Sequence, residues 1–204
     1  MKPQNKLLIA TKNQGKVTEF KKFLKELPFE IVSLSDLNIK EDVEEDGKTY
    51  LENSQKKALF FSKLSNLPTI ADDGGIEISA LNNEPGVRTR RWLGHYMSDE
   101  EIINHMLKVS KELPDNNRKA SFKAIVTLAL PNGKCWSVSG EVEGEISKTP
   151  KVNFMRGYPF RSFFYLPKIN KFYYEHELSK EEERLYNHRY KAVQKLLSII
   201  KTYA

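Results

Sequence analysis

The chain has 204 residues, of which 39% are hydrophobic and 29% charged, and its formal net charge is +6 at pH 7. A chain of this length can bury roughly 70% of its unfolded surface, so residues 1–204 are expected to form a single domain with a hydrophobic core. No hydrophobic run approaches the ~18 residues of a membrane span or suffices for a signal peptide, so neither a membrane partner nor export is expected.

Charge and cysteine content narrow the possible functions further. The basic residues favour anionic partners such as phosphates, but they are spread along the chain and never alternate with aromatic residues. A solvated basic surface is therefore favoured over a nucleic-acid-binding one. The single cysteine, Cys135, cannot form an internal disulfide, and no Cys/His cluster has the spacing of a zinc site. Together these features predict a cytoplasmic protein with no nucleic-acid partner.

The first segments have the pattern of a strand, a polar loop and a helix. Residues 6–11 predict a buried strand, and the hydrophobic spacing after residue 16 predicts an amphipathic helix. The free N–H groups at the start of such a helix favour an anion, and Lys12 and Lys16 add positive charge. The glycine spacing is not that of a Walker loop, so a phosphate-binding loop and an ordinary connection both remain open.

An acidic loop precedes the second predicted helix. Residues 29–34 predict a strand, and residues 41–47 then contain five carboxylates. Thr49 and Glu52 form a capping box for a helix to about residue 64. Asn53 and Lys57 lie four residues apart on it and therefore share a face.

Asp72 and Asp73 follow a hydrophobic run and precede Gly74 and Gly75. Residues 68–71 predict the end of one strand and residues 75–80 the alternation of another, so we expect the two aspartates at a bend between strands. Adjacent carboxylates are costly unless a cation lies near them, which points to a hard divalent metal. A solvated Asp-Gly turn explains the same residues, and both interpretations stay open here.

Residues 82–130 predict a turn, a helix and one half of a hairpin. Arg88, Arg90 and Arg91 follow the turn-rich residues 82–86 and are candidates for binding an anion. Ser98 and Glu101 predict a capped helix to about residue 113. Residues 120–130 and 134–142 alternate as antiparallel strands around a Pro-Asn-Gly turn.

The C-terminal third predicts a bent strand, a loop and one closing helix. Glycines within residues 140–146 predict a bulge or bend, and residues 151–166 predict a long aromatic loop. Ser179 and Glu182 predict the cap of a single closing helix. Its expected hydrophobic stripe comprises Leu185, Ala192, Val193, Leu196, Leu197 and Ile200. No repeat or linker marks a domain boundary.

Taken in order, these segments resemble the inosine/xanthosine triphosphate pyrophosphatase family, also called the Ham1-like family. Residues 10–19 are similar to its Ala-Thr-x-Asn-x-x-Lys-x-x-Glu signature, which binds the triphosphate. Residues 44–58 resemble its Glu-Glu-Thr-Gly and Glu-Asn-Ala-x-x-Lys-Ala blocks. Residues 72–91 resemble Asp-Asp-Ser-Gly-Leu and Pro-Gly-Val-x-Ser-x-Arg, with Gly74 in place of the usual serine. Several motifs in the right order are far more specific than any one of them.

The resemblance implies a fold and an activity. The expected fold is a single α/β domain with a long twisted mixed sheet flanked by helices, and two lobes with a cleft between them. The expected activity is magnesium-dependent hydrolysis of a nucleoside triphosphate to a monophosphate and pyrophosphate, as in the removal of ITP, dITP and XTP. The implied partners are this substrate and a second copy of the chain in a homodimer.

The resemblance also assigns roles to individual residues. Asp73 becomes the general base and a Mg²⁺ ligand, with Glu45 as the second ligand and Asp72 as a further candidate. Lys57 becomes a catalytic cation, and metal and lysines together neutralise the triphosphate. The remaining candidates for contact with the phosphates and nearby parts of the substrate are Thr11, Lys12, Asn13, Lys16, Asn53 and Gly74.

The base-recognition motifs depart from the family pattern. Aligning residues 157–164 with the family motif Gly-Phe-Gly-Tyr-Asp-Pro places Arg161 at the position of the aspartate. Another alignment register places Pro159 at that position. Glu183 stands where the family has a lysine before Ser-His-Arg. Such exchanges predict either a changed base preference or a swapped ion pair without effect. The candidate base-contacting residues are Tyr158, Phe160, Arg161, Glu183, His188 and Arg189.

Two other functions remain open at this point. One is a related pyrophosphatase for another modified or pyrimidine nucleotide, and the other is a nucleotide-binding sensor without turnover. Retention of Glu45, Lys57 and Asp73 argues against the sensor, because these are the residues that catalysis requires.

Overall fold

The computed structural model describes residues 6–151, 154–174 and 177–202. Contacts group the chain into two compact units. Unit 1 comprises Met1–Asp73, Ala124–Gly140 and Arg189–Ala204, and unit 2 comprises Gly74–Lys123 and Glu141–His188. The strands form one mixed eight-stranded sheet in the order β2-β1-β3-β5-β6-β7-β8, with β4 beside β3. The expected α/β class with a mixed sheet flanked by helices is confirmed.

Unit 1 contains the parallel part of the sheet. Its elements are β1 (Lys6–Ile9), α1 (Gln14–Leu24), β2 (Glu30–Ser33), α2 (Tyr50–Ser65) and most of α5 (His188–Lys201). Strand β1 pairs in parallel with β2 and with β3 (Thr69–Ile78). Strands β5 (Lys119–Ala129) and β6 (Cys135–Ile146) also contribute residues to this unit.

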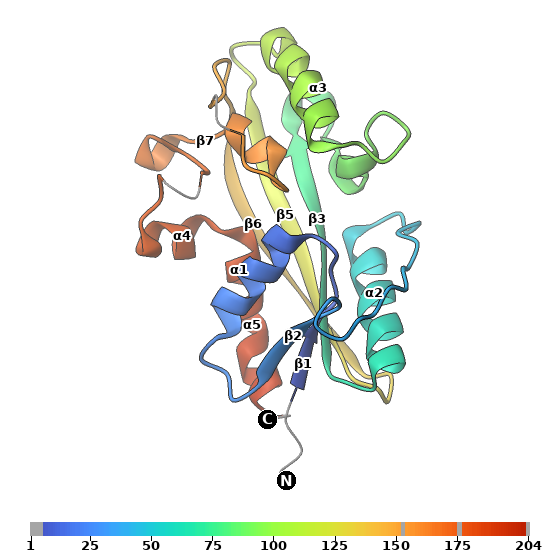
Figure 1. Ribbon diagram of the computed structural model, residues 1–204. Coiled ribbons are helices and arrows are strands. Elements are labelled where there is room, and N and C mark those ends of the chain that lie inside the picture. The colour runs from blue at the N-terminus through green and yellow to red at the C-terminus, as the bar shows by residue number, and fades with distance from the viewer. Residues whose placement is uncertain (1–5, 152–153, 175–176, 203–204) are drawn as a thin grey trace. The chain divides into compact units, whose positions relative to one another are not determined.

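Helices cover both faces of the sheet in unit 1 because β1 is hydrophobic on both sides. Leu7 and Ile9 pack with residues of α1 and α5, whereas Leu8 packs with residues of α2. This alternation follows from the two-residue period of a strand. Figure 1 shows α1 and α5 close together and α2 apart from them. A strand buried on both faces reads as a continuous hydrophobic run, as the sequence does here.

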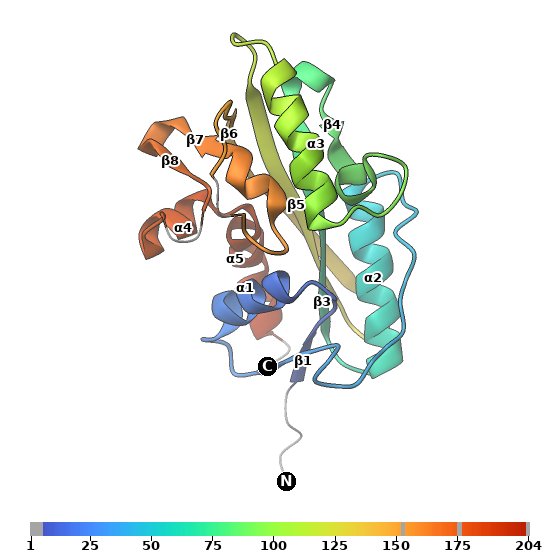
Figure 2. The same ribbon diagram turned by 45° about the horizontal axis from the view of Figure 1, so that its top comes forward.

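Unit 2 contains one long helix, several short elements and residues of β3, β5 and β6. Helix α3 (Asp99–Glu112) packs against the 3-10 helix η3 (Pro159–Phe163), as Figure 2 shows. The remaining elements are η1 (Ser79–Leu81), β4 (Glu84–Pro85), η2 (Gly86–Arg91), β7 (Phe164–Leu166), η4 (Pro167–Ile169), β8 (Lys171–Phe172) and α4 (Lys180–Tyr186).

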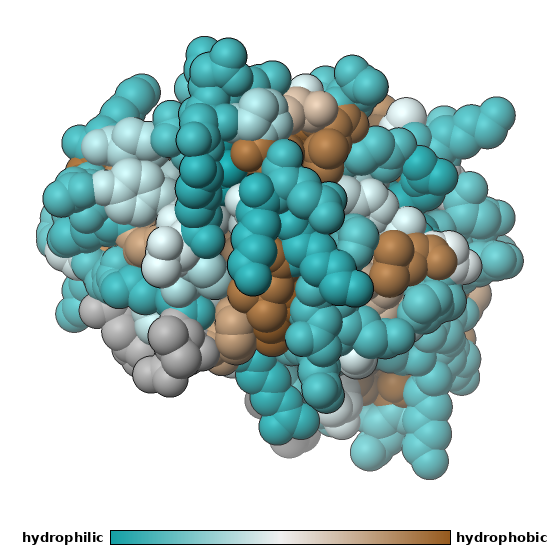
Figure 3. All heavy atoms as spheres, turned by 90° about the horizontal axis from the view of Figure 1, so that it is seen from above, coloured by the Kyte–Doolittle hydropathy of each residue, from teal (hydrophilic) through white to brown (hydrophobic). Residues whose placement is uncertain are grey.

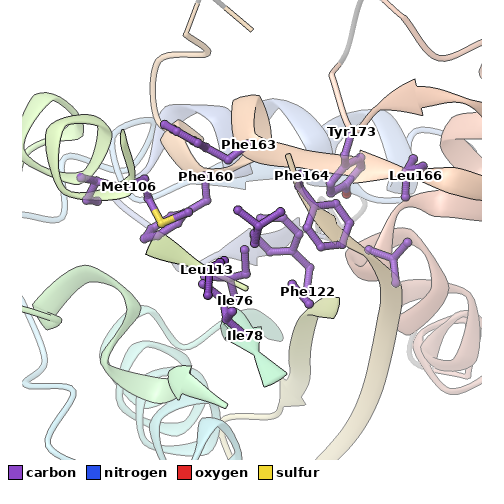
Figure 4. Packing of buried hydrophobic residues seen from close by; sticks show 14 of the residues in the cluster. Ile76, Ile78, Met106, Leu113, Phe122, Phe160, Phe163, Phe164, Leu166 and Tyr173 are labelled. Carbon is purple, nitrogen blue, oxygen red and sulfur yellow. The ribbon is translucent and has the colours of Figure 1, made fainter. Parts of the chain in front are cut away.

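The core of unit 2 is aromatic. Figure 4 shows Phe122, Phe164 and Tyr173 among aliphatic side chains from β3 and α3. The ring of Phe122 meets those of Phe164 and Tyr173 edge to face, with centroids 4.7 and 5.6 Å apart. Such pairs add roughly 0.5–1.5 kcal/mol each beyond the burial of their area. The face in Figure 3 is mostly hydrophilic, with hydrophobic groups in separate patches.

The acidic pair does not lie at a bend, so this prediction was wrong. Strand β3 runs without interruption from Thr69 to Ile78 and contains Asp72 and Asp73. The expected bend rested on Gly74 and Gly75 and on the turn chemistry of the Asp-Gly pair. Instead Asp72 is buried and paired with cations, so its charge does not end the strand.

The prediction of a single closing helix was also wrong, because this segment forms two helices. Asn187, with φ −97° and ψ 113°, separates α4 from α5, and its N–H donates to the carbonyl of Glu183. Because of this break, Leu185 in α4 does not continue the hydrophobic stripe of α5, and it is 64% exposed. The stripe is confirmed in α5, where Ala192, Val193, Leu196 and Ile200 are buried and Leu197 is partly buried.

The predicted loop 151–166 is shorter than expected. Its last residues form β7, which pairs with Glu145 and Ile146 of β6. Gly144 permits this approach, since a Cβ there would lie 2.4 Å from the carbonyl oxygen of Tyr165. The glycine is thus explained by close packing.

Several local predictions are confirmed. The capping boxes of α2, α3 and α4 are all formed with both of their hydrogen bonds. Gly133 has a φ of +88° in the turn between β5 and β6, as a hairpin glycine requires. Among the described residues, no helix combines the length and the hydrophobicity needed to cross a membrane.

Candidate active site

A buried charge network in unit 1 centres on Asp72. Its Oδ2 is 3.0 Å from Lys16 Nζ and accepts a hydrogen bond from Arg189 Nε at 2.8 Å. Burial alone would raise the pKa of Asp72, but Lys16, Arg189 and Lys57 hold it well below its usual range. Burial lowers the pKa of Lys16, and Asp72 partly opposes this shift. The carboxylate is therefore ionised and fixes two cations inside the protein.

Arg189 also reaches Glu19, so the network joins three elements. Its Nη1 lies 3.4 Å from Glu19 Oε2 in α1. Both side chains are buried. Arg189 was predicted to contact the base, and the structure places it against carboxylates of β3 and α1. The contact with the base stays a prediction.

Asp73 is held in place by a residue of α2. Asn53 Nδ2 donates to Asp73 Oδ2 at 3.0 Å, and Asn53 Oδ1 accepts the backbone N–H of Gly47 at 2.8 Å. Burial raises the pKa of Asp73, and the nearby charge of Glu45 raises it further against the opposing effect of Lys57. The fully buried Asn53 therefore links the acidic loop to the candidate base.

Lys57 lies between the acidic loop and β3. Its ammonium contacts Glu45 Oε1 and donates to the carbonyl oxygen of Asp72 at 2.6 Å. Burial alone would lower the pKa of Lys57, but the charges of Asp73, Glu45 and Asp72 together raise it. Lys57 is thus a charged lysine beside both predicted metal ligands, and the predicted shared face of Asn53 and Lys57 is confirmed.

The loop before α1 is shaped by Asn13. Its Oδ1 accepts the N–H groups of Gly15 and Lys16 at 2.9 and 3.3 Å, which caps the helix. Thr11 Oγ1 accepts the N–H of Asn13 at 3.2 Å. The fourth candidate, Lys12, pairs with Asp42 at 2.9 Å in an exposed position. The loop therefore presents a helix N-terminus next to Lys16, while contact with phosphate stays a prediction.

The acidic residues fit Mg²⁺ only together with further ligands. Among the residues that the structure describes, no group of three or more His, Cys, Asp or Glu side chains is arranged to hold a metal ion. Glu45 and Asp73 nevertheless supply two carboxylates, and burial and the charge of Glu45 both raise the pKa of Asp73. Mg²⁺ usually takes one or two carboxylates and completes its shell with waters and substrate phosphates. The donor set suits that mode of binding.

The predicted base-contacting residues of unit 2 surround a buried arginine. The Arg161 guanidinium lies 3.9 Å from the ring centre of Tyr158 and 4.3 Å from that of Tyr173. Tyr173 Oη is in turn 3.1 Å from His188 Nδ1, and the His188 ring stacks on Phe122 with centroids 5.3 Å apart. Tyrosine faces attract a cation, so both rings stabilise the guanidinium.

The other two predicted residues take different places. Phe160 is buried in η3, with its ring centroid 6.5 Å from that of Trp92. Glu183 is partly exposed on α4, and its backbone carbonyl accepts the N–H of Asn187. The possible ion pair between Arg161 and Glu183 stays open.

Sequence reasoning missed residues that reach the candidates from distant segments. Phe122 lies in the hairpin strand β5 and Tyr173 directly follows β8, and aromatic residues in such segments are ordinary core residues. Glu19 belongs to the family signature, but its partner Arg189 follows 170 positions later. The arginines expected to bind an anion have protein partners instead, with Arg88 pairing with Glu84 and Arg90 with Asp99.

The chain is similar to known proteins over almost its whole length. A protein-family model described as the Ham1 family matches residues 7–199. A dITP/XTP pyrophosphatase from Thermus thermophilus is 38% identical over 96% of this chain and 92% of its own length. The corresponding protein from Vibrio cholerae is 34% identical over 96% of each chain.

Solved structures match the fold over the same range. The Ham1 protein of Staphylococcus aureus is 32% identical, covers 98% of this chain and 100% of its own, and has a TM-score of 0.78. A HAM1 protein from Coxiella burnetii is 30% identical, covers 97% and 98%, and has a TM-score of 0.79. Because the family model and these relatives span nearly the whole chain, including the charge network of unit 1, the chain belongs to the Ham1 family.

Proposed function

We propose that this chain hydrolyses ITP, dITP and XTP between the α and β phosphates in a magnesium-dependent reaction. The products are a nucleoside monophosphate and pyrophosphate. The enzyme belongs to the nucleoside triphosphate pyrophosphatases, the same class as the relatives that match over almost their full length. Such an activity removes non-standard purine nucleotides from the nucleotide pool.

The observation that carries this proposal is the environment of Asp73. A general base works best when its pKa lies nearer the working pH than that of an exposed carboxylate. Burial raises the pKa of Asp73, and Asn53 holds one of its oxygens at 3.0 Å. In the proposed reaction, Asp73 accepts a proton from the water whose oxygen forms the new bond to phosphorus, while the bond to the bridging oxygen breaks.

The surrounding cations suit a triphosphate. Lys16 and Lys57 place positive charge beside Asp72 and Asp73, and Asp72 keeps Lys16 in position through an ion pair of 3.0 Å. Glu45 and Asp73 are the proposed Mg²⁺ ligands. When bound, Mg²⁺ supplies further neutralisation of the charge that develops on the phosphate oxygens. The protein groups are fixed in advance, so little reorganisation is needed during reaction.

Arg161 favours a second element of the proposal, a base preference that differs from that of the family motif. A guanidinium only donates hydrogen bonds, so it matches keto oxygens and not an exocyclic amino group. Its guanidinium lies over the rings of Tyr158 and Tyr173, and its N–H groups donate only in the plane of the group. We propose that this exchange changes the ranking of keto purines and keeps their preference over adenine.

A panel of nucleoside triphosphates tests the proposal. We expect pyrophosphate release from ITP, dITP and XTP with Mg²⁺, much slower release from ATP and the pyrimidine triphosphates, and none when EDTA removes the metal. Turnover of only a pyrimidine or another modified nucleotide would support the related-enzyme alternative. Binding of ITP by calorimetry without any turnover would support the sensor alternative.

A further inference from the structure

Two side chains of unit 2 hold the backbone of Gly157. Asp99, the first residue of α3, accepts the Gly157 N–H at 2.5 Å through Oδ2. Its Oδ1 accepts a hydrogen bond from Arg90 Nη1 at 2.6 Å, and Arg90 Nη2 donates to the Gly157 carbonyl oxygen at 3.1 Å. Arg90, Asp99 and Gly157 therefore form a closed ring of hydrogen bonds, called the Gly157 clamp below.

The clamp lies immediately before the residues that surround Arg161. Gly157 has a φ of +82°, which glycine adopts without the penalty of other residues. The next residue, Tyr158, contacts the Arg161 guanidinium through its ring and accepts the Arg161 N–H at 3.0 Å through its carbonyl. A displacement of Gly157 is therefore transmitted directly to Tyr158 and Arg161.

The clamp is more constrained than the other arginine pair in the same segment. Arg88 and Glu84 are 2.6 Å apart, but their side chains are 62% and 42% exposed. Those of Arg90 and Asp99 are 26% and 30% exposed, and each also bonds to the backbone. The ring needs two oxygens on one acceptor and two nitrogens on one donor, so neither asparagine nor lysine reproduces it.

A ring contact joins the same segments a second time. Trp92 follows Arg90 by two positions, and its ring meets that of His105 in α3 edge to face at 4.6 Å. Trp92 also lies beside Phe160 of η3, at 6.5 Å between ring centroids. The segments η2, α3 and η3 are thus held together by both hydrogen bonds and ring packing.

We propose that Arg90 and Asp99 are positioning residues for base recognition. The clamp fixes Gly157 so that Tyr158 and Arg161 are oriented to read the base. This inference rests on the proposed function, which assigns residues 158–161 to the base. Arg90 occupies an unspecified position of the Pro-Gly-Val-x-Ser-x-Arg motif, so the clamp belongs to this chain and not to the motif.

Steady-state kinetics of Arg90→Ala and Asp99→Asn test the clamp in the full chain. We expect the KM for ITP to rise about tenfold, equivalent to about 1.4 kcal/mol, with kcat within about twofold. The ratio of kcat/KM for ITP to that for ATP should fall by a similar factor. The double variant should raise the KM for ITP no further than either single change does, because both residues act through Gly157. Arg90→Lys should fail to restore the KM, since it offers one nitrogen.

Arg88→Ala is the matched control, because it removes an arginine ion pair from the same 3-10 helix and should leave KM unchanged. Hydrogen exchange of the ligand-free protein gives a readout that does not require turnover. Peptides covering residues 157–163 should exchange faster in both clamp variants and not in Arg88→Ala. Unchanged exchange and KM in the clamp variants would overturn the inference. Faster exchange in a protein that hydrolyses no nucleotide would preserve the clamp and refute the proposed function and the role in base recognition.

Discussion

Two buried arginines of this chain are held by opposite kinds of neighbour. Arg189 of unit 1 is held by the carboxylates of Asp72 and Glu19, whereas Arg161 of unit 2 lies over the rings of Tyr158 and Tyr173. Carboxylates bond to the edge of a guanidinium and fix its charge, while aromatic rings hold its faces. The first arrangement suits a site built for fixed charge, and the second suits a site that selects a partner by hydrogen bonding.

The largest effect should come from removing the charge of Asp73. Asp73→Asn keeps the size of the side chain and the neighbouring Asn53, but it cannot accept the proton of the attacking water. We expect hydrolysis of ITP to fall at least about 10³-fold, measured as pyrophosphate release. The melting temperature should stay close to that of the parent protein, because burial raises the pKa of Asp73 and its ionised form therefore does not stabilise the fold.

The control for this variant is Asp115→Asn, which neutralises an exposed carboxylate paired with Lys148. It should retain full activity, because Asp115 lies far along the chain from every candidate residue. Near-normal turnover in Asp73→Asn would show that another group accepts the proton.

A smaller effect, on stability, is expected from Asp72→Asn. The change leaves the buried cations Lys16 and Arg189 without their shared carboxylate, and removing one partner of a buried pair costs about 3–5 kcal/mol. The folded-state pKa of Asp72 is lowered, so its stabilisation is present above the unfolded pKa of about 3.9 and is lost as pH falls through the folded value.

Urea unfolding at pH 7 and at successively lower pH measures this contribution. The difference between the parent and Asp72→Asn should be largest at pH 7 and should shrink in acid, as the parent carboxyl becomes protonated. Equal stability at pH 7 would mean that the two cations find other partners, and the contrast between the two arginines would then lose half its basis.

Substitutions of Arg161 sharpen the other half of the contrast. Arg161→Leu keeps a buried side chain but removes all donors, and we expect the preference for XTP and ITP over ATP to fall about 10–100-fold in kcat/KM. Arg161→Lys should lose most of this preference too, because an ammonium lacks the planar guanidinium and its fork of donors. Loss of kcat for every nucleotide alike would place Arg161 in the chemistry and not in base choice.

The charge network was predictable from sequence only through the spacing of motifs. Local patterns correctly gave the strand before α1, the capped α2 and the shared face of Asn53 and Lys57. They failed at Asp72 and Asp73, because turn chemistry is judged from neighbours in sequence. The cations that let these residues stay inside β3 come from α1 and α5, and no local rule includes them.

The surroundings of Arg161 were less predictable for a related reason. The aromatic rings and the clamp come from η2, α3, β8 and the residues around them, and each is an ordinary core or surface residue by its local pattern. The single closing helix was predicted because the 3.6-residue periodicity continues through Asn187. Only the extended backbone angles of Asn187, φ −97° and ψ 113°, show where the first helix ends.

The smallest expected effect concerns Asp36, an exposed counterpart of Asp72 in the same unit. Its Oδ2 accepts bonds from Lys21 Nζ and from the N–H of Ser33, both at 2.9 Å. These bonds, led by that from Lys21, lower the pKa of Asp36 to about 2. Its stabilisation is therefore present above about pH 3.9 and lost as pH falls toward 2.

Because the pair is exposed to solvent and salt, Asp36→Asn should lower the free energy of unfolding at pH 7, measured with urea, by less than about 1 kcal/mol. The loss should diminish in 1 M NaCl, whereas that of Asp72→Asn should persist, since buried charges are screened far less. A loss that matched that of Asp72→Asn would show that burial does not separate the two carboxylates.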